Sequence, residues 1–237
     1  MLLISERMRF PNGIIEIMDN TVGSINVKKL LSEPQAAYIL GLFCADGYHR
    51  TSSIGLSNKD EELLGRFAHF LLDYFPKERL RIRAYYPVEV KSPKLSKKLI
   101  ALSQNIVYYP LLKAKQISCH LYVNSRPLLR MFTSARKEIE KIKSKAIISY
   151  IAGRFDGDGS VNKMKNIDFR ILYGNYKEAK IDQSLLKRIG VSKSSIYHYK
   201  QARTFCLYVW REETSSLMKL LLPFSVYLQK RLTSITP

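Results

Sequence analysis

Two aspartates of this chain, Asp46 and Asp158, occupy the same position in a short segment that occurs twice. Residues 36–47 read AAYILGLFCADG and residues 148–159 read ISYIAGRFDGDG, with six of twelve positions identical at an offset of 112 residues. Carboxylates that such a duplication brings together can bind a hard divalent cation such as Mg²⁺, which prefers oxygen ligands. Beside a phosphodiester, a cation of this kind assists hydrolysis.

Small residues recur at every fourth position of both copies, which predicts two helices in close contact. We expect N-caps at Ser32 and Ser144, and helix ends at Gly47 and Gly159. A glycine inside a helix costs about 1 kcal/mol relative to alanine, so its presence here needs a packing reason. A spacing of four puts the small residues on one face of each helix. The expected contact is made by Ala37, Gly41, Ser149 and Gly153.

Parallel packing of these helices would place both aspartates at one end of the contact. Each would then lie at a helix C-terminus, where the macrodipole disfavours an anion by about 0.3–1 kcal/mol, and the two carboxylates would repel each other. A divalent cation offsets both penalties. We therefore predict a Mg²⁺ site formed by Asp46 and Asp158, with oxygen ligands also at Ala45 and Gly157.

The charge of the chain points to a polyanionic partner. Of 237 residues, 39 are Lys or Arg and 20 are Asp or Glu, a formal net charge of +19, which favours nucleic acid over a membrane. No apolar run reaches the roughly 18 residues that span a bilayer, and the first residues do not form a signal peptide. The three cysteines show no metal-binding spacing and are expected to be reduced and buried. We expect an intracellular protein of a prokaryotic cytoplasm or an organelle matrix, neither secreted nor membrane-bound.

The segments ILGLFCADG (39–47) and IAGRFDGDG (151–159) resemble the motif of the LAGLIDADG homing endonuclease family. The resemblance implies an α+β fold of two pseudo-symmetric αββαββα half-domains, with the motif helices at their interface. The two four-stranded antiparallel sheets would form a DNA-binding saddle. The expected division is an N-terminal extension (1–31), a first half-domain (32–143) and a second half-domain (144–237).

The same resemblance implies an activity and a cofactor. The metal-binding acid of the family is the eighth letter of the motif, which is Asp46 in one copy and Asp158 in the other. The expected protein is a monomer for intron or intein homing that cuts both strands of a long asymmetric site and leaves 3′ overhangs. Mg²⁺ would support cleavage, Mn²⁺ would substitute, and Ca²⁺ would bind without supporting cleavage. An RNA-binding maturase acting on its own intron, or a DNA-binding protein that has lost catalysis, remains an alternative on this scaffold.

Two letters depart from the motif. The sixth letter, usually aspartate, is Cys44 in the first copy, where we expect a buried thiol. The fourth letter, usually apolar, is Arg154 in the second copy, which suggests a face that is exposed or near phosphate.

Basic residues lie on or beside the expected strands of both halves. Residues 79–83, RLRIR, alternate arginine with apolar residues, as a strand that faces DNA on one side does. The predicted DNA contacts are Arg50, Arg79, Arg81, Arg83, Lys163, Lys165, Arg170, Lys200 and Arg203. The family also places a basic residue near each metal site. The candidate in the second half is Lys230. In the first half it is Lys141, which the sequence does not separate from Lys137 and Lys143.

Overall fold

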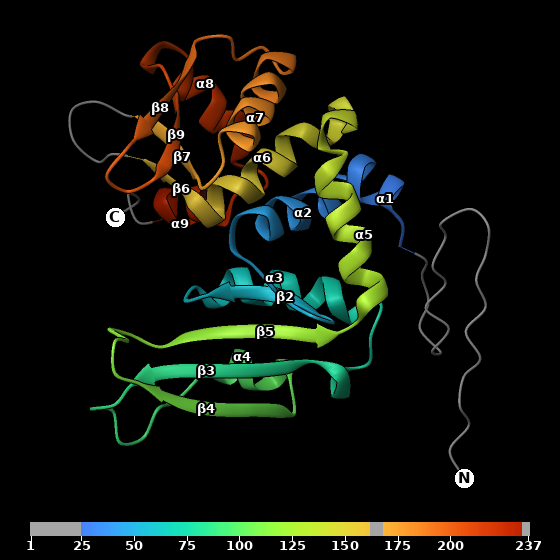
Figure 1. Ribbon diagram of the computed structural model, residues 1–237, viewed down its shortest axis with the longest axis vertical. Helices are drawn as coiled ribbons and strands as arrows, with labels where there is room; N and C mark the ends of the chain where they lie inside the picture. The colour runs from blue at the N-terminus through green and yellow to red at the C-terminus, as the bar shows by residue number, and fades with distance from the viewer. Residues whose placement is uncertain (1–24, 162–167, 234–237) are drawn as a thin grey trace.

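The computed structural model describes residues 25–161 and 168–233, which form two halves joined by a pair of parallel helices (Figure 1). In each half a sheet carries helices on one face. This confirms the predicted α+β class with two related half-domains and with the motif helices between them. Within the described ranges, no helix has the length and apolar character that crossing a membrane requires.

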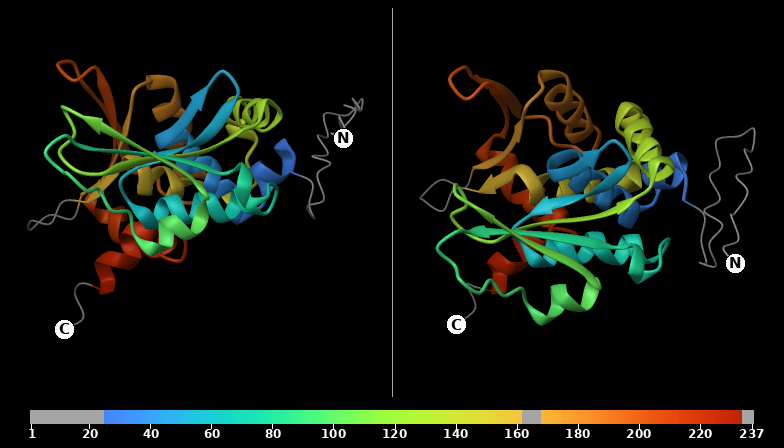
Figure 2. Two further views of the ribbon diagram at one scale, coloured as in Figure 1. Left: turned by 90° about the horizontal axis from the view of Figure 1, so that it is seen from below. Right: turned by 60° about the horizontal axis from the view of Figure 1, so that its bottom comes forward.

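Within residues 25–137, the first half contains five α-helices, two of them short, one 3-10 helix and a five-stranded sheet. Its elements are α1 (Val27–Ser32), α2 (Pro34–Asp46), β1 (Gly47–Arg50), β2 (Ser53–Asn58), α3 (Glu61–Leu72), η1 (Lys77–Arg79), β3 (Arg81–Pro87), α4 (Lys97–Leu102), β4 (Asn105–Leu111), β5 (Ser118–Asn124) and α5 (Arg126–Lys137). The strand order is β1-β2-β5-β3-β4. In the left view of Figure 2, α3 and α4 lie beneath the strands of this sheet.

The fifth strand corrects the prediction of two four-stranded antiparallel sheets. β4 pairs with β3 in the parallel direction, whereas every other pair in the described sheets is antiparallel. A parallel neighbour needs a crossover connection, and the chain from Val88 to Gln104, with α4 in it, provides one. β4 therefore extends the outer edge of the first sheet.

The second half has the predicted four-stranded antiparallel sheet, in the order β6-β7-β9-β8. Its elements follow the 3-10 turn η2 (Ile139–Lys141) and are α6 (Ser144–Asp158), β6 (Gly159–Val161), β7 (Phe169–Tyr173), α7 (Tyr176–Arg188), β8 (Ser194–Tyr199), β9 (Thr204–Val209), α8 (Arg211–Leu221) and α9 (Val226–Thr233). α7 ends before Gly190, whose φ of +89° lies in the left-handed region that glycine adopts easily.

The two motif helices touch backbone to backbone at their glycines. A Cβ atom on Gly41 would lie 2.2 Å from the carbonyl oxygen of Tyr150, and one on Gly153 would lie 2.1 Å from that of Tyr38. Such distances leave no room for any side chain. This close contact is the predicted packing reason for two glycines inside helices, where each glycine lowers helix stability relative to alanine.

Both helices begin without the predicted side-chain caps. α2 starts at Pro34 after Glu33, because Ser32 is the last residue of the preceding helix α1. α6 starts at Ser144 itself, so that Lys143 is its N-cap residue. The backbone N–H of Lys143 donates to the carbonyl of Leu31 at 2.8 Å, which holds the starts of the two helices together. The two helices therefore run parallel, and their C-terminal residues, Asp46 and Asp158, lie at the same end of the pair.

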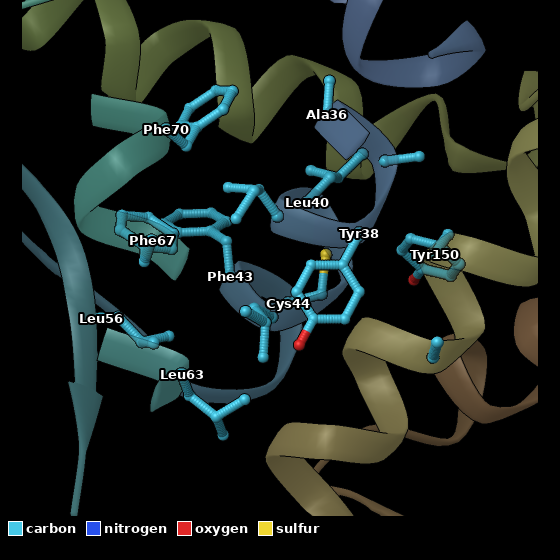
Figure 3. Packing of buried hydrophobic residues seen from close by; sticks show 14 of the residues in the cluster. Ala36, Tyr38, Leu40, Phe43, Cys44, Leu56, Leu63, Phe67, Phe70 and Tyr150 are labelled. Atoms are coloured by element: carbon cyan, nitrogen blue, oxygen red, sulfur yellow. The ribbon is translucent and has the colours of Figure 1, made fainter. Parts of the chain in front are cut away.

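Each motif helix is also buried on its other sides. Phe43 of α2 packs edge-on against Phe132 of α5, with ring centroids 5.1 Å apart, and Phe70 of α3 meets the same ring. Figure 3 shows Phe43, Phe67 and Phe70 on one side of α2, while Tyr38 points from α2 toward α6 on the other. Burial all round explains why neither motif helix has the polar stripe of a surface helix.

We expect Gly41→Ala to lower the free energy of unfolding by about 3 kcal/mol or more, because the added methyl group would force the two backbones apart. Gly65→Ala in α3 is the matched control, since a Cβ there would meet nothing within 4 Å. The control should stabilise the protein by up to about 1 kcal/mol. Denaturant unfolding of both variants measures the difference, and equal effects would contradict the close contact.

Candidate active site

Asp46 and Asp158 lie side by side where the motif helices end. A Cβ on Gly157 would be 2.4 Å from the Cβ of Ala45 and 3.2 Å from Oδ2 of Asp46, so the last turn of α6 directly contacts the last turn of α2. Both carboxylates are half-buried. This is the arrangement that parallel packing of the small-residue faces predicts.

The local environment disfavours the ionised form of both carboxylates. Burial and the charge of Asp158 raise the pKa of Asp46 to about 6, although a hydrogen bond from Asn58 acts in the opposite direction. Burial also raises the pKa of Asp158, with Glu178 adding to the rise and Arg154 opposing it. A site that concentrates unfavourable negative charge in this way is suited to a cation.

Asn58 is a polar partner of Asp46 that the sequence analysis missed. Its Nδ2 donates to Oδ2 of Asp46 at 2.7 Å, and its Oδ1 accepts from the backbone N–H of Asp60 at 2.8 Å. The second bond identifies which amide atom faces the carboxylate. Asn58 ends β2, and its position beside Asp46 depends on the pairing of β1 with β2, which is not evident from the residues alone.

A cavity of about 650 Å³ opens beside Asp46. It is lined by Asp46, Asn58, Lys59, Lys115 and Gly157, and also by the first residues of α9. Lys59 and Lys115 are exposed cations at its edge. They were not among the predicted site residues, because both lie in connections between elements rather than in the expected strands.

The sixth motif letter has a structural role in the second copy. Asp156 accepts hydrogen bonds from the hydroxyl of Tyr38 at 2.7 Å, from the hydroxyl of Ser225, and from the backbone N–H groups of Val226 at 2.7 Å and Tyr227 at 3.2 Å. The carboxylate therefore caps α9 and ties it to α2 in the other half. In the first copy Cys44 occupies this position as a buried thiol, and burial raises its pKa to about 11.

The expectation for Arg154 is wrong. Only 1% of this residue is exposed, and its guanidinium pairs with Asp182 at 3.3 Å and with Glu178 at 3.7 Å, both on α7. It also lies over the ring of Tyr173, 4.6 Å from the centroid. The arginine is accommodated in the interior because α7 provides two carboxylates for it, which the motif alone does not reveal.

The two candidate lysines lie at opposite ends of the helix pair. Lys230 of α9 donates to both carboxylate oxygens of Asp60, at 2.7 and 2.8 Å, and Asp60 is the residue whose backbone binds Asn58. Lys141 lies in η2, before the start of α6, and is exposed beside Glu138. Lys141 was the candidate for the site of the first half. Because the two motif helices are parallel and α6 is about 22 Å long, it lies at the end of the pair opposite to Asp46 and is not placed to assist there, which corrects that assignment.

In the first half, the alternation of side chains along β3 places some of the predicted basic residues on the open face of the sheet. Leu80 and Ile82 are buried, and Arg81 and Arg83 lie on the opposite, open face of β3. Arg79 departs from this pattern, because it lies in η1 and donates to the carbonyl of Asn124 at 3.0 Å. Arg50 is exposed at the end of β1.

In the second half, Arg170 and Lys200 line one concavity on the open face of the sheet. Arg170 is paired with Asp168 at 2.9 Å, and Arg203 lies in the turn that joins β8 to β9. Lys163 and Lys165 fall outside the described residues.

The donor set around Asp46 and Asp158 fits a hard divalent cation. In the described part of the chain, no group of three or more His, Cys, Asp or Glu side chains is placed to hold a metal ion. Two carboxylates are nevertheless the usual protein contribution to a Mg²⁺ site that a phosphate and waters complete. Ala45 and Gly157 lie in the last turns of α2 and α6, where backbone carbonyl groups have no donor within the helix.

Comparison with known proteins agrees with this architecture. A family model described as a LAGLIDADG-like domain matches residues 33–134. The structure of I-DmoI in complex with DNA and Ca aligns with a TM-score of 0.59 at 17% identity, covering 88% of this chain and 100% of that chain. I-DmoI in complex with DNA and Mn gives 0.56 at 18% identity, covering 83% and 98%. The homing endonuclease I-WcaI, bound to its DNA recognition sequence, gives 0.54 at 16% identity, covering 84% and 87%. No curated protein matches the sequence.

We expect Asp46→Asn to stabilise the protein at about pH 7 by about 1 kcal/mol, because it removes a carboxylate whose ionisation the fold disfavours. Since the raised pKa means that the folded protein binds more protons between about pH 4 and 6, the wild-type protein gains stability as the pH falls through this range. The advantage of the variant should therefore shrink toward about pH 4.

Urea unfolding at several pH values measures this difference. Asp73→Asn is the control, because Asp73 is an exposed acid at the C-terminal end of α3. A difference that does not change with pH would contradict the assigned environment of Asp46.

Proposed function

We propose that the chain is a metal-dependent DNA endonuclease of the LAGLIDADG family, because a LAGLIDADG-like domain model matches residues 33–134 and the two-half fold is similar to that of homing endonucleases. The observation that carries the proposal is the pair of aspartates, held together at the ends of two contacting helices although each carboxylate is electrostatically disfavoured. In the proposed reaction, a monomer cuts both strands of a long asymmetric site and leaves 3′ overhangs. This is the activity expected of intron or intein homing in an intracellular compartment.

The residues of the chain divide the work between binding and chemistry. Arginines and lysines on the open faces of both sheets neutralise phosphates and orient the duplex. Asp46 and Asp158 hold Mg²⁺, with Mn²⁺ as a substitute and Ca²⁺ as a non-cleaving ligand. When bound, the cation supplies charge stabilisation at the scissile phosphate and a more acidic water. Asn58 holds the carboxylate of Asp46 in one orientation, and Lys230 is anchored near it by Asp60.

Cleavage is tested with a randomised duplex library and with the uninterrupted locus into which the gene would insert. We expect cutting with Mg²⁺, none with Ca²⁺, and a loss of at least about a hundredfold in both Asp46→Asn and Asp158→Asn. Asp73→Asn should cut like the wild-type protein. If no duplex is cut with Mg²⁺ at any salt concentration while intron RNA binds tightly, the endonuclease proposal fails and the maturase function is supported.

We expect Arg81→Ala to weaken binding to a labelled duplex and to reduce the slope of log K against log salt by about 1, because one phosphate contact is lost. Lys187→Ala removes the same charge from α7, on the opposite face of the second sheet, and should leave the slope unchanged. Salt titrations of binding in Ca²⁺ measure both variants. Equal slopes for Arg81→Ala and the wild-type protein would remove Arg81 from the interface.

A further inference from the structure

The two sheets have matching strand orders except for one insertion in the first half. The orders β1-β2-β5-β3-β4 and β6-β7-β9-β8 match when β3 corresponds to β8 and β5 corresponds to β9. In the second half residues 200–203 join β8 directly to β9, whereas in the first half residues 88–117 lie between β3 and β5. This 88–117 insertion contains α4 and β4, which have no counterpart between β8 and β9.

β4 widens the open face of the first sheet, the face that carries Arg81 and Arg83. The register of the parallel pair places Val107 of β4 beside Arg83 of β3. It also places Tyr109 beside Tyr85, and the two rings are stacked with their centroids 5.6 Å apart. The side chains of Val107 and Tyr109 therefore continue the surface on which the arginines lie.

The 88–117 insertion is strongly basic. Its one acidic residue is Glu89, and its six lysines are all exposed: Lys91, Lys94, Lys97, Lys98, Lys113 and Lys115. Lysine is depleted in the interfaces between proteins, whereas clustered lysines attract phosphates. The charge of the insertion therefore favours a nucleic acid over a protein as the molecule that covers it.

The open side of β4 is apolar within these basic surroundings. Val107 is 50% exposed, and Tyr109 beside it is exposed as well. In the major groove of a duplex, the group that an apolar side chain recognises is the 5-methyl group of thymine. An exposed valine next to an arginine, on a face bordered by lysines, is suited to a thymine flanked by phosphates.

We propose that the 88–117 insertion is an additional DNA-binding element, and that Val107 contacts the methyl group of a thymine in the target. The inference rests on the DNA binding of the proposed function, but it does not depend on cleavage. The lysines of the insertion neutralise phosphates, and the apolar side of β4 distinguishes thymine from bases without a methyl group. Because the connection between β8 and β9 has no such strand, this contact makes recognition by the two halves chemically unequal.

Binding in Ca²⁺ tests this contact on the duplex that the protein selects by binding from the randomised library. Each thymidine of the duplex is replaced in turn by deoxyuridine, which removes only the 5-methyl group. We expect at least one replacement to weaken binding by about fourfold, the effect of one apolar methyl group returned to water. Val107→Ser should weaken binding to the unmodified duplex to a similar extent. It should also bind the thymidine and deoxyuridine forms equally well at that position.

Ile100→Ser is the matched control, because Ile100 is 48% exposed on α4, which lies beneath the strands on the covered face of the sheet (Figure 2). This variant should keep the affinity and the thymine preference of the wild-type protein. If Val107→Ser keeps the full preference for thymine, the inference is wrong.

Sedimentation of the free protein checks the other possible occupant of β4. A wild-type dimer that Val107→Ser abolishes would assign the apolar side of β4 to a second copy of the chain and would overturn the inference. A monomer in both proteins is the expected result. A protein that binds no duplex from the library would instead contradict the proposed function itself.

Discussion

The contact between α2 and α6 at Gly41 and Gly153 is the constraint on which the rest of the structure depends. At these two positions the backbone of one helix replaces the side chain of the other. The contact fixes the distance and the direction of the helices, and through them the relation between the two sheets. It also brings Asp46 and Asp158 together, because each ends its helix a little more than one turn beyond the glycine. The interface between the halves and the candidate active site are thus one feature.

Placing two carboxylates there works against folding. Burial and the charge of Asp158 disfavour the ionised form of Asp46 and raise its pKa. Both carboxylates also lie at helix C-termini, where the macrodipole disfavours an anion. The surrounding structure supports this arrangement with neutral and cationic groups instead of removing the acids. Asn58 donates to Asp46, and Lys59 and Lys115 border the cavity. Such an electrostatic conflict is typical of sites that are completed by a ligand.

Much of this arrangement could be predicted from the residues, because it is encoded by local periodicity. The repeat, the four-residue spacing of small side chains and the Asp-Gly ends are all contiguous in sequence. Asn58, Arg154 and β4 could not be predicted in the same way. The position of Asn58 depends on strand register, the burial of Arg154 depends on acids from α7, and β4 depends on a crossover through α4. Lys141 was misassigned because it was chosen for its position late in the first half, although the predicted helix 144–159 already placed it before the helix start, at the end opposite to the aspartates.

The two departures from the motif make the halves non-interchangeable. Tyr38 of the first motif helix donates to Asp156 of the second, whereas Tyr150 of the second donates to Asp182 of α7, since Cys44 offers no carboxylate. If two copies of the first half paired through their motif helices, each Tyr38 hydroxyl would face a thiol and lose its acceptor in a dry interface. Pairing of two second halves would keep the equivalent acceptor. The first half therefore depends on the second half for the acceptor of its Tyr38 hydroxyl, and a symmetric pair of first halves would bury this hydroxyl without one.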